Sequence, residues 1–173
     1  MRINKNLVIK SVIYSFIFIF FIVLETNILN GVKIFGVKPN LIILLVIAAS
    51  VAENERYASV LGLILGFITD SSVGSPFFFS GVYYFFAAYI AGTVTRVYFT
   101  KSFFTMLVIT LPVCAARGII NMFYLIAVWS DFNIGGALLI YILPEFIYTV
   151  TLAPPVYFTV KFTAGKFPYH VIS

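Results

Sequence analysis

Three charged residues lie inside long apolar stretches of the sequence: Asp70, Arg117 and Glu145. A charged side chain inside a bilayer costs at least about 2.5–3.5 kcal/mol on insertion scales unless another group satisfies it. Counted at about 1.5 Å per residue from Tyr57 and from Phe103, at the cytoplasmic ends of their stretches, Asp70 and Arg117 both lie about 20 Å deep, and Glu145 lies about 14 Å from the outer end of its stretch near Gly136. We therefore predict an intramembrane Asp70–Arg117 ion pair. Glu145 lies within reach of the same guanidinium, which has five hydrogen-bond donors.

Three roles are open to this polar cluster of Asp70, Arg117 and Glu145. It can hold the helices in register, as buried ion pairs do without adding net stability. It can form a path for a proton or a substrate, or a polar dock for a partner helix. Hydrolase chemistry has few groups to draw on, because Cys114 and His170 are the single cysteine and the single histidine. We predict no catalytic residue, no metal site and no cofactor.

Glycines precede Asp70 at a regular spacing. Gly62, Gly66 and Asp70 are four residues apart, and Gly74 continues the series. Residues four apart share one face of a helix, and glycines on that face allow a second helix to approach closely. We therefore predict a helix-packing face at Gly62, Gly66 and Gly74. A new helix is expected to begin directly afterwards at Ser75-Pro76, and its free N–H groups favour an anion such as Asp70.

The composition places these residues in a membrane protein. Hydrophobic residues make up 62% of the 173 residues and charged residues 10%, and the mean hydropathy is +1.08. Soluble domains average about 45–50% apolar and about 25% charged residues, so soluble and nucleic-acid-binding classes are excluded. A bilayer core of about 30 Å needs about 20 helical residues. Six stretches fit this length within a single transmembrane domain, 1–173: about 7–28, 34–52, 57–73, 76–95, 103–129 and 136–160.

The basic residues indicate the orientation of these spans. With the N-terminus inside, eight basic residues lie on the cytoplasmic side and two lie outside, which is the positive-inside bias. We predict an all-α integral membrane protein with six transmembrane helices and cytoplasmic N- and C-termini. The second and third spans are short, and the alternative is one re-entrant hairpin, which would invert the later spans and remove the bias. The eight inside residues are Arg2, Lys5, Lys10, Arg56, Arg96, Lys101, Lys161 and Lys166, and the two outside are Lys33 and Lys38.

Several motifs accompany the spans: Lys38-Pro39-Asn40-Leu41 at the start of an apolar run, Gly62-x-x-x-Gly66-x-x-x-Asp70-x-x-x-Gly74-Ser75-Pro76, and Pro144 with Pro154-Pro155 in the terminal span. Together they resemble the MreD family of bacterial rod shape-determining membrane proteins. The resemblance covers nearly the whole chain. The family usually has Ser-Gly after the aspartate, where Val73 here separates Ser72 from Gly74. It also usually has an acid at the position of Asn40.

This resemblance implies a non-enzymatic scaffold of the cell-elongation complex in the bacterial cytoplasmic (inner) membrane, surrounded by membrane lipid. It implies helix-packing contacts with MreC, a single-span protein with an extracytoplasmic domain. It further implies association with the cytoskeletal protein MreB, the wall polymerase RodA and its class B penicillin-binding partner. The implied role is control of cell shape and of lateral peptidoglycan synthesis.

An alternative function is that of a transporter component. The substrate-binding subunits of energy-coupling-factor vitamin transporters are also six-span proteins of similar size, and the MreD family is similar to them in architecture. Those subunits often carry a small-x-x-x-small pattern in the first span, which docks onto the energising module. Residues 13–21 here read Ile-Tyr-Ser-Phe-Ile-Phe-Ile-Phe-Phe and lack that pattern, which counts against transport.

Overall fold

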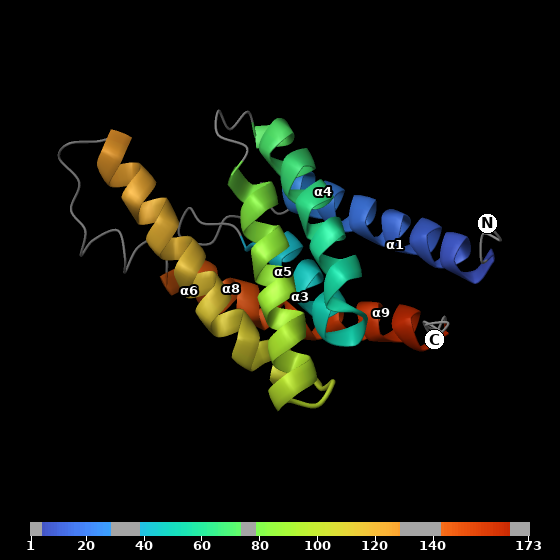
Figure 1. Ribbon diagram of the computed structural model, residues 1–173. Coiled ribbons are helices and arrows are strands. Elements are labelled where there is room, and N and C mark those ends of the chain that lie inside the picture. Colours follow the sequence, from blue (N-terminus) through green and yellow to red (C-terminus); the bar gives the residue numbers. More distant parts are fainter. Residues whose placement is uncertain (1–4, 29–38, 74–78, 129–142, 167–173) are drawn as a thin grey trace.

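The computed structural model describes residues 5–28, 39–73, 79–128 and 143–166 (Figure 1). Within these ranges the chain is all-helical, as predicted, with seven α-helices, one π-helical segment and no strand. The elements are α1 (Lys5–Val23), the π-helix η1 (Leu24–Ile28), α3 (Leu41–Ala52), α4 (Glu55–Val73), α5 (Phe79–Tyr98), α6 (Phe103–Val128), α8 (Leu143–Thr151) and α9 (Ala153–Lys166).

The short helix α3 forms the centre of the bundle. Eleven of its 12 residues are buried, and it packs against α1, α4, α5, α6 and α9 (Figure 1). A helix that is apolar on every side needs such neighbours all round. At 1.5 Å per residue α3 is about 18 Å long, which is less than the roughly 30 Å core of a bilayer. Within the predicted second span, 34–52, the described helix begins at Leu41 with Asn40 as its N-cap, and residues 34–38 lie outside the described ranges.

Helices α4 and α5 lie antiparallel and side by side (Figure 1), and theirs is the most extensive helix contact in the described part of the chain. The start and end of α4 agree with the predicted third span, 57–73, to within two residues. The fourth span was expected at 76–95, whereas α5 runs from Phe79 to Tyr98. The expected helix start at Ser75-Pro76 lies outside the described residues.

The longest helix is α6, which has 26 residues and continues through Pro112. Its stretch Phe103–Phe123 is, among the residues that the structure describes, the one helical stretch long and apolar enough to cross a membrane. Two shorter apolar helical stretches are Val12–Asn27 and Leu41–Ala52. In Figure 1 the C-terminal end of α6 diverges from α5. The six-span count and its orientation stay predictions.

The predicted sixth span, 136–160, is divided into two helices. α8 ends at Thr151, and its last turn is tightened because the Leu152 N–H donates to the carbonyls of Tyr148 (3.3 Å) and Thr149 (3.1 Å). The proline pair Pro154-Pro155 then lies in the first turn of α9, where the missing N–H groups would have had no helical partner. Residues 136–142 lie outside the described ranges.

Candidate functional site

The N-terminus of α3 is buried, and side chains accept two of its backbone N–H groups. Asn40 Oδ1 accepts the Ile43 N–H at 3.0 Å, and Glu25 Oε2 accepts the Ile42 N–H at 3.1 Å. Glu25 and Asn40 are only 4% and 6% exposed. The first N–H groups of a helix have no partner within the helix, and the helix dipole favours a carboxylate beside them. Glu25 thus reaches from the π-helical segment η1 to cap a helix that begins 16 residues later.

Tyr84 of α5 connects this helix end to α6 and is fully buried. Its hydroxyl lies 3.3 Å from both the amide nitrogen and the amide oxygen of Asn40. Arg117 of α6 donates through Nη1 to the same hydroxyl, and its guanidinium carbon lies 5.1 Å from the Tyr84 ring centroid. The contact therefore combines a hydrogen bond with a cation–π interaction.

Helix α8 joins the same network. The Asn40 N–H donates to Thr149 Oγ1 at 3.1 Å, and the Thr149 hydroxyl donates to the Glu145 carbonyl at 2.6 Å. Arg117 and Glu145 line one cavity of about 10 Å³, together with Asn40, Cys114 and Thr149. We call the set of Glu25, Asn40, Tyr84, Arg117, Glu145 and Thr149 the α3 polar cluster.

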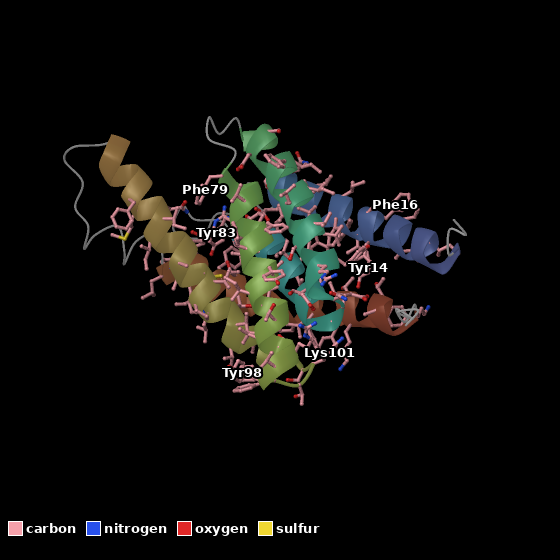
Figure 2. All side chains as sticks on the ribbon, in the orientation of Figure 1. Tyr14, Phe16, Phe79, Tyr83, Tyr98 and Lys101 are labelled. Carbon is pink, nitrogen blue, oxygen red and sulfur yellow. The ribbon has the colours of Figure 1, made fainter. Side chains whose placement is uncertain are left out.

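A second cavity lies between α5 and α6 and has a volume of about 30 Å³. Figure 2 shows two of its lining residues, Phe79 and Tyr83, on the side of α5 toward α6. A water molecule needs about 10–15 Å³ by this measure, so the two cavities have room for about one and two waters. Arg117 lines both cavities, and the remaining residues of the second one are Ser80, Ile120 and Asn121.

Asp70 lies apart from this cluster. Its Oδ2 accepts the Ser80 N–H at 2.8 Å, and the residue is only 5% exposed. Ser80 is the second residue of α5, so Asp70 binds the free N–H groups that the sequence predicts beside it. The predicted Asp70–Arg117 ion pair is absent from the described residues, and that prediction is corrected. The physical reason is that the start of α5 brings a nearby donor onto Asp70, while Arg117 bonds to Tyr84.

The glycine face of α4 is covered by α5 of the same chain. A β-carbon at Gly62 would lie 2.8 Å from the carbonyl oxygen of Tyr84, and one at Gly66 would overlap the backbone of Ser80 and Gly81. Only glycine permits so close a helix approach at these positions. Gly74, the third residue of the predicted face, lies outside the described residues.

The opposite end of α3 is also tied to other segments. Lys101 Nζ donates to the carbonyls of Ala52 (3.1 Å) and Glu53 (3.2 Å), where a cation complements the helix dipole. The Tyr14 hydroxyl of α1 donates to Glu53 Oε1 at 2.9 Å. Figure 2 shows Lys101 at this end of the bundle. Both ends of the central helix are therefore fixed by side chains from other elements.

Sequence reasoning did not single out Glu25, Asn40 and Tyr84 as members of the site. Asn40 carries a usable signal, because asparagine after proline and before an apolar run is typical of an N-cap. For Glu25 and Tyr84 the partners are distant in sequence, and no local pattern indicates them.

The comparisons with known proteins identify a family. A sequence model described as rod shape-determining protein MreD matches residues 5–163 of the 173 residues, a range that includes the whole α3 polar cluster. A search of curated proteins gives no match, and neither does a search of solved structures. The chain therefore belongs to the MreD family of rod shape-determining proteins, a family of bacterial membrane proteins.

Proposed function

We propose that this chain is a non-enzymatic membrane scaffold of the bacterial cell-elongation complex. The observation that carries the proposal is the family match over residues 5–163. In this role the chain crosses the cytoplasmic membrane six times, with both termini in the cytoplasm. It holds MreC through helix packing, and its further partners are MreB, RodA and a class B penicillin-binding protein.

The α3 polar cluster supports a rigid scaffold. Its hydrogen bonds connect η1, α3, α5, α6 and α8 to one another. A polar group left without a partner in a bilayer costs several kcal/mol, so helices that share such bonds resist sliding past one another. On this proposal Arg117 and Glu145 keep the bundle in register, and Asp70 fixes the start of α5.

Partner helices then have to use faces other than the glycine face, because α5 already covers Gly62 and Gly66. Large apolar side chains are exposed on several helices, α4, α5 and α9 included, and we select the outward faces of α1 and α6 as the two candidates. Figure 2 shows Phe16 on the outer side of α1, whereas Tyr14 of the same helix points toward α9. The exposed apolar residues of these two faces are Val12, Phe16, Ile19, Phe20 and Val23 on α1 and Leu111, Ile119 and Phe123 on α6. We propose these two faces as the contacts for partner spans.

The first experiment is to purify the tagged chain from native membranes in a mild detergent and to identify the accompanying proteins by mass spectrometry. The scaffold proposal expects MreC and wall-synthesis proteins. Recovery of an ATPase pair and a coupling subunit, without MreC, would overturn it in favour of a transporter component.

The faces are tested by cross-linking from single cysteines. Cys114 is the only cysteine, so Cys114→Ala gives a cysteine-free background. Phe16→Cys and Ile119→Cys on the proposed faces are expected to cross-link to a partner span. Ile64→Cys, on an exposed face of α4 (48% exposed), is the matched control and is expected not to do so. Equal cross-linking from all three positions would contradict the assignment of the faces.

The transporter alternative is the weaker candidate. A pocket for a vitamin-sized molecule occupies about 300–1,000 Å³. The cavities on either side of Arg117 measure about 10 and 30 Å³. They suit individual water molecules, and the polar groups around the smaller one already bond to one another.

A further inference from the structure

The side of α6 that faces α5 carries two hydrogen-bond donors for which the described residues provide no acceptor. The Nε atom of Arg117 is buried and has no hydrogen-bond partner within the described ranges. Asn121 lies four residues later, hence on the same face of α6, and its side chain is exposed. Both residues line the cavity of about 30 Å³ between α5 and α6. The Tyr83 hydroxyl, which also lines this cavity, already donates to the Val113 carbonyl.

The position of these donors along α6 limits where an acceptor can come from. Arg117 lies near the middle of α6, which runs from Phe103 to Val128. At mid-depth of a span the surrounding lipid is hydrocarbon and has no acceptor, and a polar group left unpaired there costs several kcal/mol. The acceptor therefore has to come from water or from another polypeptide.

The α5 wall of the cavity is apolar and incompletely covered. Phe79, Tyr83 and Phe86 are spaced by four and three residues, so they share one face of α5. Figure 2 shows Phe79 and Tyr83 of this face on the side toward α6. Phe79 and Phe86 are 51% and 57% exposed. An apolar helix can pack against this wall while one of its polar side chains reaches the two donors.

Charge and size select the chemistry of that polar side chain. Glu145 lines the neighbouring cavity on the other side of Arg117, so the guanidinium already has a carboxylate close by. The missing group is thus an uncharged acceptor. The cavity has room for about two water-sized atoms, which fits the end of a serine, threonine, asparagine or glutamine side chain. A second copy of this chain fits poorly, because a symmetric interface would bring two Arg117 guanidinium groups together.

We propose that the α5–α6 cavity receives an uncharged hydrogen-bonding side chain (Ser, Thr, Asn or Gln) from the membrane span of a partner protein. The partner span packs on Phe79 and Phe86, and its polar side chain accepts from Arg117 Nε and the Asn121 amide. This inference rests on the proposed scaffold function and adds the location and chemistry of one partner contact. The contact differs from the outward face of α6, because Asn121 is about 200° around the helix from Ile119.

The test measures the association of the full chain with full-length MreC, the partner in the proposed function, by fluorescence energy transfer in lipid vesicles. Asn121→Leu removes the amide and should weaken the association about three- to tenfold, the effect of one hydrogen bond between helices in a membrane. Asn121→Gln keeps an amide and should lose less. The matched control is Ser71→Leu, which also replaces an exposed polar side chain with leucine. Ser71 lies on the same face of α4 as Ile64 and bonds within its own helix to the Phe67 carbonyl.

Leucine substitutions in the MreC span then identify the acceptor. One uncharged polar position of that span should couple to Asn121 in a double-mutant cycle. Unchanged association in Asn121→Leu, or the lack of any coupled position, would overturn the cavity contact and leave water as the occupant, while the scaffold function would stand. Failure of the wild-type chain itself to bind MreC would overturn the scaffold function and the inference that rests on it.

A measurement on the chain alone tests the second copy as occupant. Self-association of the wild-type chain that Asn121→Leu weakens would overturn the proposal in favour of a contact between two copies. Asn121 is exposed and takes no part in the Arg117–Tyr84 contact, so Asn121→Leu should keep the Tm of the wild type. An unchanged Tm shows that a loss of association comes from the contact and not from unfolding.

Discussion

Replacing Gly66 with alanine measures how closely α4 and α5 approach each other. The new β-carbon would overlap the backbone of Ser80 and Gly81, which cannot rotate aside as a flexible side chain can. Overpacking of this kind costs about 1–3 kcal/mol, and backbone overlap belongs at the upper end. The better helix propensity of alanine offsets about 1 kcal/mol of that cost. We therefore expect a net loss of about 2 kcal/mol, which lowers Tm by about 4–8 °C in a chain of this size.

The assay uses the single cysteine of the chain. Cys114 lines the cavity beside Arg117 and is partly buried, so a thiol-reactive fluorogenic dye reports unfolding in detergent during a thermal ramp. Gly165→Ala is the matched control, since a β-carbon at Gly165 meets nothing within 4 Å. That variant should be unchanged, or more stable by up to about 1 kcal/mol.

Gly62→Ala should fall between these two variants. Its β-carbon would lie 2.8 Å from the carbonyl oxygen of Tyr84 and 3.1 Å from a methyl group of Val46, which can shift. If Gly66→Ala unfolded at the same temperature as the wild type, α4 and α5 would lie farther apart than the structure places them, and the packing argument would be refuted.

Substitutions at Glu25, at Tyr84, and at Asp70 and Arg117 together test the polar contacts with the same thermal assay. Glu25→Ala leaves the buried Ile42 N–H without an acceptor, so the free energy of unfolding should fall by about 1–3 kcal/mol, and Glu25→Gln should lose less because it keeps an acceptor oxygen. Tyr84→Phe removes the acceptor of Arg117 and should destabilise by a similar amount; an unchanged Tm would argue against that contact. Asp70→Asn and Arg117→Gln should add to within about 0.5 kcal/mol, since they have different partners, and strong coupling in the double-mutant cycle would instead support an ion pair.

The helices of this fold follow from the sequence more readily than their ends do. Apolar runs bounded by polar residues locate α4 and α6 to within two residues of the predicted spans. The described helix α3 begins at Leu41, seven residues after the start of the predicted span, because Asn40 caps it. The N-cap preference of Asn40 is the stronger signal there, since it has a direct physical cause in the free N–H groups.

The polar contacts were harder to predict, because depth along a helix fixes only one coordinate. The predicted spans put Asp70 and Arg117 at similar depths, yet depth says nothing about which way each side chain points around its helix axis. Asp70 turns to the start of α5, and Arg117 turns to Tyr84. Tertiary packing decides which residues surround α3. The role of Glu25 as a cap of α3 could therefore not be predicted from the residues next to it in the sequence.

The bonds at the two ends of α3 also determine when, during synthesis, its terminal groups gain their hydrogen-bond partners. The Asn40 N–H bonds to Thr149, which the ribosome adds 109 residues later. At about 5–20 residues per second, that interval lasts roughly 5–20 s. The C-terminal carbonyl of α3 at Ala52 likewise waits for Lys101. The Asn40 N–H therefore gains its acceptor only after α8 has been made, whereas the Ile42 and Ile43 N–H groups have theirs as soon as Glu25, Asn40 and α3 are in place.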